Sequence, residues 1–320
     1  MTTDYFEKGI NPFLLDIQDQ ENYDITDYIQ IQQKINEKDL DLFIESLYSK
    51  EPINYSLTEM KRRCTKGIHQ QLIDLSTNEL PSIQLVKIGN GGDGKKCIVC
   101  CKPLFIDRYI VSENIIQSLE DVGFNGHFMI LNGGFPNPTG TEMKYAAVPY
   151  SFKIFMMLEA KKRGFEFVIW LDSVCYAVNN PEPLFDKIKR DDAIFRSFSP
   201  NCFMPNTCNQ IVFPKTIEYL NKLVDRDIRN DTNVNSIVFG LNLTSPQILE
   251  FIQEYYEMVK RGLPFLSNFP EEIVFTSIFN KPYYRYVFKN SNENCKLYIH
   301  AAYSSKENAK YQGYYFIQQS

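Results

Sequence analysis

The sequence predicts an α/β fold in which helices flank a mainly parallel central sheet. Short apolar runs rich in β-branched and aromatic residues alternate along the chain with longer segments of helical periodicity. Strands that alternate with helices are typical of parallel sheets, because parallel neighbours need long crossover connections. The strongest strand signal lies at residues 165–171, where six of seven residues are apolar. A continuous apolar run of this length predicts a strand that is buried on both faces.

The length and composition predict one large domain with an N-terminal extension. The chain has 320 residues, of which 44% are hydrophobic and 23% charged, so a sizeable core can form. Residues 1–80 are polar and acidic, with apolar residues at helical spacing. We therefore expect residues 1–80 to form a helical extension and residues 81–320 to form the main domain.

The main domain is expected to begin with a β-hairpin. Apolar runs at 83–88 and 95–101 flank the Gly/Asn/Asp turn at 89–94, which is the usual signal for two paired strands. The elements expected next are a helix at 107–122, a strand at 127–131, a Gly/Pro/Asn-rich loop at 132–142, a helix at 149–163 that begins near a proline, the strand at 165–171, a helix at 183–189 and a strand at 193–195.

The last third of the main domain continues the alternation. Helices are expected at 215–224, 246–260 and 271–279, and strands at 237–243, 284–288 and 296–300. We expect the last two of these strands to close the central sheet.

The net charge, the first residues and the cysteine content indicate which partners and which cellular location to expect. The formal net charge of −5 argues against a nucleic-acid backbone as the main partner, because such proteins carry a basic excess. Residues 1–7 lack the basic and apolar regions of a signal peptide, and no apolar run reaches the length of a membrane span. Eight cysteines are too sparse for a disulfide framework. We therefore expect a reduced, cytoplasmic protein without a transmembrane segment.

Two local patterns look like sites but have simpler explanations. The turn at 89–94 lacks the Lys-Ser/Thr of a phosphate-binding P-loop and does not open a helix. Cys97 and Cys100 form a C-x-x-C within a strand, where residues three apart face opposite sides of the sheet. That geometry suits neither a zinc site nor a redox pair, so we expect small buried cysteines.

Asp172 is the strongest candidate for a functional residue. It follows directly after the buried strand at 165–171, and the carboxyl ends of strands form the rim where open α/β sheets bind ligands. The alternative is a turn or helix cap after the strand, assisted by Ser173. The local sequence leaves both interpretations open.

Four further features bear on a ligand site. Gly240 interrupts an apolar strand, which permits close approach of a ligand or of another backbone. Glu271 and Glu272 begin a predicted helix, although the helix dipole alone favours acidic residues there. His300, one of three histidines, ends the last predicted strand, where a structural imidazole is the alternative. Asn132 opens the long loop after the strand at 127–131, and such loops are often functional.

Taken in order, these motifs resemble the GT-A fold of nucleotide-sugar-dependent glycosyltransferases. The segments that carry the resemblance are 169–174 (IWLDSV), 237–242 (IVFGLN), 270–274 (PEEIV) and 298–300 (YIH), with 148–153 (VPYSFK) similar to segments of glycosyltransferase-like proteins. The resemblance covers about residues 95–303 and does not reach the first 80. In that family a strand ends in an Asp-x-Asp motif that binds a divalent metal and the sugar nucleotide. Here Val174 stands where the second Asp is expected, so the motif is degenerate.

The resemblance implies a hexosyl- or pentosyltransferase. Its donor would be a UDP- or GDP-linked sugar, and its acceptor a hydroxyl of a glycan, a protein or a small molecule. It implies Mn²⁺ or Mg²⁺ held by Asp172, His300 and the diphosphate oxygens. It also implies that Glu271 or Glu272 acts as the catalytic base. The donor-binding residues that it implies are Arg108, Tyr109, Asn132, Lys153, Asp172, Ser173 and Gly240.

Two other functions are compatible with parts of the sequence. A non-catalytic sugar-nucleotide-binding protein on the same scaffold is favoured by Val174. A dinucleotide-dependent oxidoreductase fits less well, because the glycine fingerprint and its downstream acidic residue are missing. The alternative to a donor-binding role for Lys153 is a surface residue on its helix. The sequence leaves the donor, the acceptor, the stereochemistry and the oligomeric state open.

Overall fold

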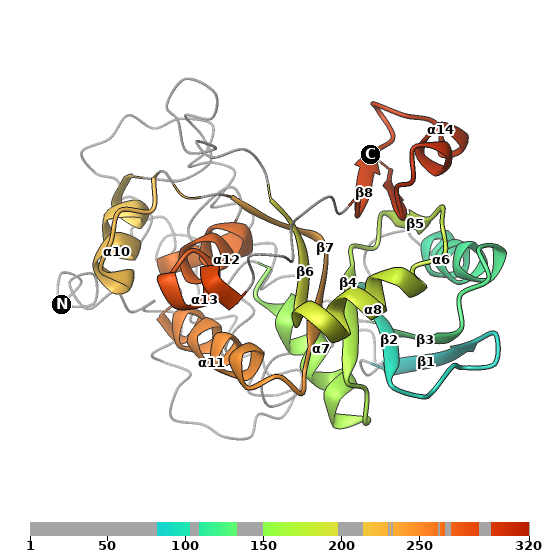
Figure 1. Ribbon diagram of the computed structural model, residues 1–320, viewed down its shortest axis with the longest axis horizontal. Helices are drawn as coiled ribbons and strands as arrows, with labels where there is room; N and C mark the ends of the chain where they lie inside the picture. The colour runs from blue at the N-terminus through green and yellow to red at the C-terminus, as the bar shows by residue number, and fades with distance from the viewer. Residues whose placement is uncertain are drawn as a thin grey trace, which may run out of the picture.

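The fold is described from a computed structural model of the chain (Figure 1). The structure describes residues 82–102, 109–132, 150–197, 214–229, 231, 233–261, 263–265, 270–287 and 296–319. The helical extension expected at residues 1–80 lies outside the described residues, as does most of the loop expected at 132–142. The boundary between extension and main domain therefore stays a prediction.

A six-stranded sheet forms the centre of the protein, in the order β1-β3-β2-β4-β7-β6. Its strands are β1 (Ser82–Ile88), β2 (Lys96–Lys102), β3 (Gly126–Asn132), β4 (Phe167–Leu171), β6 (Ala193–Ser197) and β7 (Val234–Asn242). Together with the helices on both of its faces, this sheet confirms the predicted α/β fold with flanking helices.

The pairing of these strands is more mixed than the sequence predicts. Only the β2–β3 and β2–β4 neighbours are parallel, whereas β1 is antiparallel to β3 and β7 is antiparallel to both β4 and β6. Strands β2, β3, β4 and β6 nevertheless run in the same direction, because β7 reverses between β4 and β6. The consequence for the site is that the start of β7 lies at the same edge of the sheet as the end of β4.

The predicted hairpin at the start of the domain is wrong. Strand β3 lies between β1 and β2 and pairs with both of them. The Gly-rich turn instead packs on the segment that leads into β3, where Asn90 N donates to Asn125 Oδ1 at 3.2 Å. Gly89 has a φ of +58°, and a Cβ there would stand 2.3 Å from the same oxygen, so this contact requires glycine.

The two strands expected to close the sheet are also misplaced. Residues 282–287 form a helix, α13 (Pro282–Val287), which begins at a proline, a residue suited to the first helical turn. Strand β8 (Tyr298–His300) exists, but it belongs to a second sheet of three strands in the order β5-β9-β8. Its partners are β5 (Cys175–Ala177) and β9 (Phe316–Gln318).

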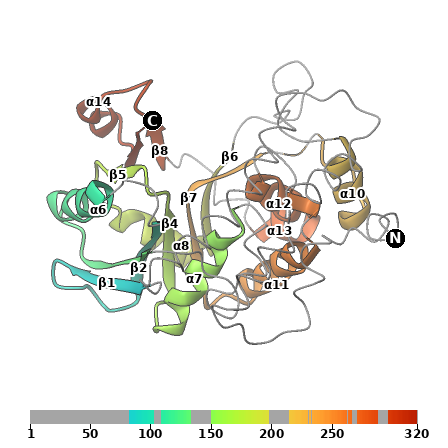
Figure 2. The same cartoon turned by 180° about the vertical axis from the view of Figure 1, so that it is seen from behind.

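The predicted helices are confirmed where the structure describes them. They are α6 (Tyr109–Asp121), α7 (Phe152–Lys162), α8 (Glu182–Asp191), α10 (Pro214–Val224), α11 (Pro246–Arg261) and α12 (Pro270–Phe279). A short helix that was not expected, α14 (Lys306–Tyr311), lies between β8 and β9. Figures 1 and 2 show α10 to α13 gathered beside the β6–β7 half of the sheet, with the small sheet and α14 near α6.

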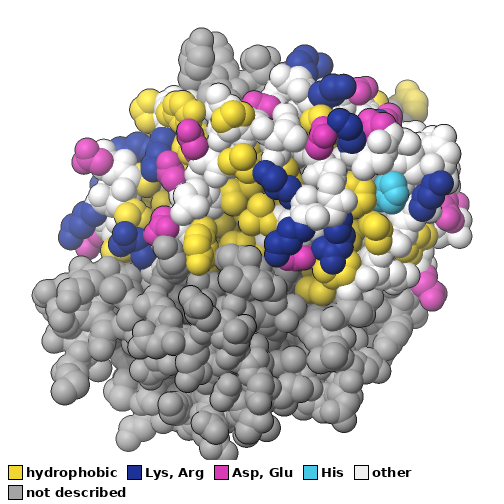
Figure 3. All heavy atoms as spheres, turned by 90° about the horizontal axis from the view of Figure 1, so that it is seen from below, with side chains coloured by type: hydrophobic (Ala, Val, Ile, Leu, Met, Phe, Trp, Pro, Cys, Tyr) yellow, Lys and Arg dark blue, Asp and Glu magenta, His cyan; other side chains and the backbone are white. Residues whose placement is uncertain are grey.

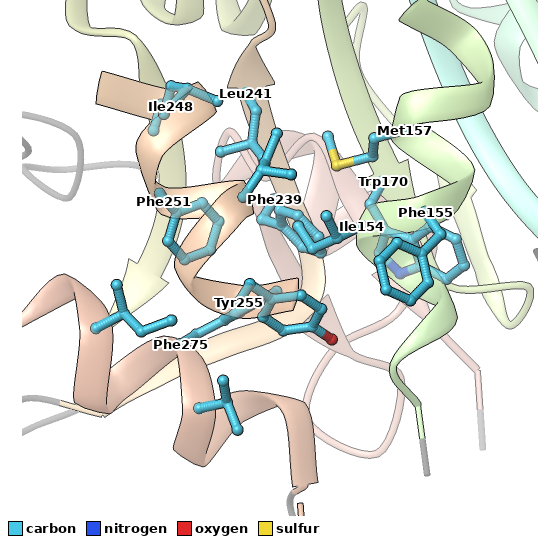
Figure 4. Close-up of a cluster of buried hydrophobic side chains, with 14 of the residues drawn as sticks. Ile154, Phe155, Met157, Trp170, Phe239, Leu241, Ile248, Phe251, Tyr255 and Phe275 are labelled. Carbon is cyan, nitrogen blue, oxygen red and sulfur yellow. The ribbon is translucent and has the colours of Figure 1, made fainter. Parts of the chain in front are cut away.

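The core lies on both faces of the central sheet, because side chains alternate along each strand. On β4, Val168 and Trp170 belong to one hydrophobic cluster, and Ile169 and Leu171 belong to the other. All five residues of β4 are buried, as the sequence predicts. Helices α7, α10, α11 and α12 cover the first face, while α6 and α8 cover the second. Figure 4 shows the first cluster, with side chains that include Ile154, Phe155, Trp170, Phe239, Phe251, Tyr255 and Phe275.

The cysteines of β2 follow the same alternation. Cys97 and Cys101 lie in the first cluster and Cys100 in the second. All three are buried, which confirms their expected role as small core residues. Among the described residues, no helix combines the length and the apolar character that a bilayer crossing needs. Figure 3 shows one face on which acidic and basic side chains are interspersed over the described part.

Candidate functional site

The candidate site lies where the end of β4 meets the start of β7. Asp172 follows β4, and its backbone N donates to the carbonyl oxygen of Ile237 at 3.0 Å. Because β7 is antiparallel to β4, the residues just before Ile237 lie beyond the end of β4. Asn235 and Ser236 are therefore brought to the same edge of the sheet as Asp172.

Lys153 joins four elements at this edge. Its Nζ lies 3.0 Å from Asp172 Oδ1 and 2.8 Å from Glu271 Oε1. It also donates to the carbonyl oxygen and to the Oγ of Ser236, both at 3.1 Å. Only 3% of the Lys153 side chain is exposed, so the alternative of a surface lysine is wrong. A buried ammonium is tolerated only when it is paired and hydrogen-bonded, and here the end of β4, the start of β7 and α12 supply the partners of a lysine on α7.

Glu271 and Glu272 stand side by side in the first turn of α12, and both are buried. Ser236 Oγ donates to Glu271 Oε1 at 2.6 Å. Glu272 Oε1 accepts from Asn235 Nδ2 at 2.6 Å and from Ser236 N at 3.1 Å. The helix dipole favours acidic residues at this position, but it does not explain their burial, which depends on β7 and Lys153.

Burial and neighbouring charges shift the pKa values of Glu272, Asp172 and Lys153. Burial and the neighbouring charge of Glu271 raise the pKa of Glu272 to about 8, although Ser236 N and Lys153 oppose the shift. Burial also raises the pKa of Asp172, against the ammonium of Lys153. Burial lowers the pKa of Lys153, but the carboxylates of Asp172 and Glu271 outweigh it, so the net shift is upward. Near pH 7 we therefore expect a charged lysine beside a protonated Glu272.

This protonation state predicts a pH-dependent stability. Folded Glu272 keeps its proton up to about pH 8, whereas an ordinary Glu loses it near pH 4.5. The folded state then binds more protons than the unfolded state between these values, so the free energy of unfolding falls as the pH rises through this window. One such group contributes a slope of at most about 1.4 kcal/mol per pH unit. Urea unfolding of the wild type and of Glu272→Gln at pH 5, 6, 7 and 8 measures it, and parallel curves for the two proteins would contradict it.

Of the three charged residues Asp172, Lys153 and Glu271, Asp172 is the one that reaches solvent. Its side chain is 25% exposed, against 3% for Lys153 and 6% for Glu271. Trp170 Nε1 donates a hydrogen bond to Asp172 Oδ1 at 2.6 Å, and the same oxygen forms the ion pair with the Lys153 ammonium. The turn after β4 is closed by a backbone bond, from Cys175 N to the Asp172 carbonyl oxygen at 2.9 Å. The Asp172 carboxylate is thus oriented by two side chains at the edge of a buried cluster.

The described residues hold no ready-made cluster of metal ligands. No group of three His, Cys, Asp or Glu side chains converges among them. Val174 is partly buried and packs against the second cluster. In the small sheet, Gln318 of β9 pairs with Cys175 of β5 on one side and with His300 of β8 on the other. His300 is therefore two strands, or roughly 10 Å, from Cys175. Its Nδ1 accepts from Ala302 N at 3.0 Å. Metal binding by Asp172 and His300 therefore stays a prediction.

The other predicted donor-binding residues lie at different places along the chain, and their roles stay predictions. Asn132 ends β3 at the same edge of the sheet as Asp172, and Ser173 is half-buried in the turn after β4. Tyr109 is the first residue of α6, and Arg108 lies outside the described residues.

Gly240 makes room for side chains of α8 and β6, and its role in donor binding stays a prediction. A Cβ on Gly240 would stand 2.4 Å from Ile188 Cδ1 of α8 and 3.0 Å from Ile194 Cγ1 of β6. The missing side chain therefore lets Ile188 of α8 and Ile194 of β6 pack closely against β7.

Several members of the site escape the sequence-based prediction. Asn235, Ser236, Trp170 and Tyr298 all belong to its hydrogen-bond network. The strand signal at 237–243 starts three residues too late, since β7 begins at Val234. Two polar residues at the very start of an otherwise apolar strand are a usable signal for a site at that edge.

Comparisons with known proteins give structural likenesses only. No family model matches the sequence, and no curated protein matches it. Mouse xyloside xylosyltransferase 1 is similar over 70% of this chain and 97% of its own, at 11% identity and a TM-score of 0.41. The galactosyltransferase LgtC is similar over 70% of this chain and 86% of its own, at 12% identity and a TM-score of 0.38. The bifunctional glycosyltransferase WbbM is similar over 72% of this chain and 47% of its own, at 12% identity and a TM-score of 0.42. These values are too low to support a conclusion about activity.

Proposed function

We propose that the protein is a glycosyltransferase that moves a sugar from a nucleotide-diphosphate sugar to an acceptor hydroxyl. The observation that carries this proposal is the contact of Lys153 with both Asp172 and Glu271, because it gathers two carboxyl groups at the carboxyl end of a buried strand, with Glu272 next to them in sequence. Ligands of open α/β sheets bind at this edge. A cluster of perturbed titratable groups at such an edge is a functional-site signal.

Asp172 is proposed to hold the donor. It is the most exposed of the three residues in the two ion pairs of Lys153, and its carboxylate accepts hydrogen bonds from hydroxyl groups such as those of a sugar or a ribose. Trp170 and Lys153 fix its orientation through Oδ1. A carboxylate whose rotamer is fixed in this way positions a substrate at little cost in conformational entropy.

Glu272 is proposed as the base of an inverting transfer. The acceptor oxygen forms a bond to the anomeric carbon, the bond from that carbon to the diphosphate oxygen breaks, and the nucleoside diphosphate leaves with the electron pair. Glu272 takes the proton of the acceptor hydroxyl, for which a pKa of about 8 is well matched to a neutral medium. Glu271, next to it, stabilises positive charge that develops on the sugar ring.

The base role predicts a pH–rate profile. Only the ionised form of Glu272 can accept a proton, so kcat/KM is expected to rise with pH and to level off above about pH 8. Glu272→Gln removes the base and is expected to lose about 100-fold or more in kcat. Initial rates between pH 6 and 9 test both points. A profile that is flat across this range in the wild type contradicts the role.

Donor binding and transfer are tested separately. UDP- and GDP-sugars that bind the folded state are expected to raise its melting temperature by mass action, and each is measured with and without Mn²⁺. Transfer is then followed by release of the nucleoside diphosphate in the presence and absence of a panel of acceptors. If no nucleotide sugar changes the melting temperature and none is consumed, the proposal is wrong.

The second candidate is a sugar-nucleotide-binding protein without turnover. The observation that favours it is the burial of Glu271 and Glu272, which restricts the access of an acceptor to either of them. A donor that stabilises the protein but is never consumed, with any acceptor and at any pH from 6 to 9, would favour this candidate over the transferase.

A further inference from the structure

A hydrogen-bond chain continues from Glu272 to the small sheet. Asn235 donates through Nδ2 to Glu272 Oε1 at 2.6 Å. Its Oδ1 accepts from the hydroxyl of Tyr298 at 2.8 Å and from Ile237 N at 3.1 Å. Asn235 and Tyr298 are each 4% exposed, so water does not compete freely for these groups.

These contacts determine which way the amide of Asn235 points. An amide carries one acceptor and one donor end, and a backbone N–H can only donate. Reversal of the amide would set its NH₂ group against Ile237 N and the Tyr298 hydroxyl, and its oxygen against the Glu272 carboxylate. The two donors on Oδ1 therefore hold Nδ2 toward Glu272.

Tyr298 is itself held from two sides. The Arg196 guanidinium carbon lies 4.9 Å from the centre of its ring, and Arg196 Nη1 donates to its carbonyl oxygen at 2.9 Å. Its backbone belongs to β8, which pairs with β9. A tyrosine hydroxyl keeps its proton across the neutral range, so it can act as a donor there. The ring and its hydroxyl thus have a defined place.

We propose that Asn235 and Tyr298 are positioning residues for Glu272, through which residues 296–319 complete a site built on the central sheet. This inference rests on the proposed function, in which Glu272 is the base. Asn235 touches the carboxylate directly, and Tyr298 acts through Asn235. The charged groups that face Glu272 are Glu271 on α12, Lys153 on α7 and Asp172 after β4, with Arg196 of β6 behind Tyr298.

The physical effect is on the ionised form of Glu272. An N–H donor at 2.6 Å stabilises a carboxylate and opposes the burial that raises its pKa. Without the Tyr298 hydroxyl, the amide of Asn235 loses one of the two donors that hold its orientation. With the amide reversed, its oxygen would face the Glu272 carboxylate and disfavour ionisation. Removal of either group is therefore expected to raise the pKa of Glu272.

The pKa of Glu272 can be measured without an activity assay. Glutamate labelled with ¹³C at the side-chain carboxyl is incorporated into the full chain, and the Glu272 signal is identified by its loss in Glu272→Gln. Its titration is followed in the wild type, Tyr298→Phe and Asn235→Ala. Tyr298→Phe keeps the ring beside Arg196 and removes only the hydroxyl. Tyr303→Phe is the matched control, because Tyr303 is 82% exposed in the same segment.

We expect an upward shift of at least about one pKa unit in Asn235→Ala and a smaller upward shift in Tyr298→Phe. Tyr303→Phe is expected to titrate like the wild type. If the protein has transferase activity, the midpoint of its pH–rate profile is expected to move by the same amount in each variant.

Three outcomes decide the inference. A purely structural role would lower the melting temperature of Tyr298→Phe and leave the Glu272 titration unchanged, and that result overturns the proposal. If Asn235→Ala does not fold, Tyr298→Phe decides by itself. If neither the wild type nor any variant shows transfer, the proposed function fails, but the shift of the carboxyl signal still decides whether the two residues position Glu272.

Discussion

Replacing Lys153 by methionine is expected to lower the free energy of unfolding by about 3–5 kcal/mol. Methionine fills a similar volume without the charge, so the carboxylates of Asp172 and Glu271 would lose their shared cation in a buried place. Removal of one partner of a buried ion pair costs this much because the remaining charge is left uncompensated. Urea unfolding at pH 7 measures the difference.

A matched control and a rescue sharpen this prediction. Lys162→Met lies on the same helix, but its side chain is 53% exposed and pairs with Glu159 at the surface, so a change within about 0.5 kcal/mol is expected. Adding Glu271→Gln to Lys153→Met removes one of the orphaned charges and is expected to recover part of the loss. Equal effects of the two single lysine variants would show that the buried cluster does not depend on Lys153.

Asp172→Asn is expected to lower kcat/KM by about 100-fold or more while the fold persists. The substitution keeps the shape of the side chain but removes the negative charge that accepts from the donor hydroxyls in the proposed function. Lys153 keeps Glu271 as an ionic partner, so the melting temperature is expected to change far less than in Lys153→Met.

The control for Asp172→Asn is Asp186→Asn, an exposed aspartate on α8. It is expected to leave both kcat/KM and the melting temperature unchanged. Nucleoside diphosphate release at saturating acceptor and a melting curve suffice for both variants. Near-normal transfer by Asp172→Asn would remove Asp172 from the site.

The part of the site that the sequence predicts is the part that depends on local patterns. Strand β4 is recognisable because a strand covered on both faces is continuously apolar, and Asp172 stands out because it ends that run. Glu271 and Glu272 are recognisable as the acidic first turn of a helix. Each of these signals lies within a few residues of the sequence.

The contacts that make these residues a site are beyond local patterns. Lys153 and Ser236 are 83 residues apart, and Tyr298 and Asn235 are 63 apart. Nothing near Lys153 indicates that it is buried. The packing at Gly240 is equally out of reach, because the missing side chain makes room for Ile188 of α8, which the sequence cannot place. The hairpin is wrong because β3 competes for the same strand edges.

Because the small sheet contains strands from near the C-terminal end of the chain, the site can be completed only late in translation. Strand β5 follows Asp172 after a short turn, and its neighbour is β9, with Gln319 N donating to the Val174 carbonyl oxygen at 2.8 Å. During translation the central strands leave the ribosome long before residues 316–319 do. Until then the segment after Asp172 lacks its partner, and Asn235 lacks the Tyr298 hydroxyl. A nascent chain with a finished central sheet would therefore still be without a finished site.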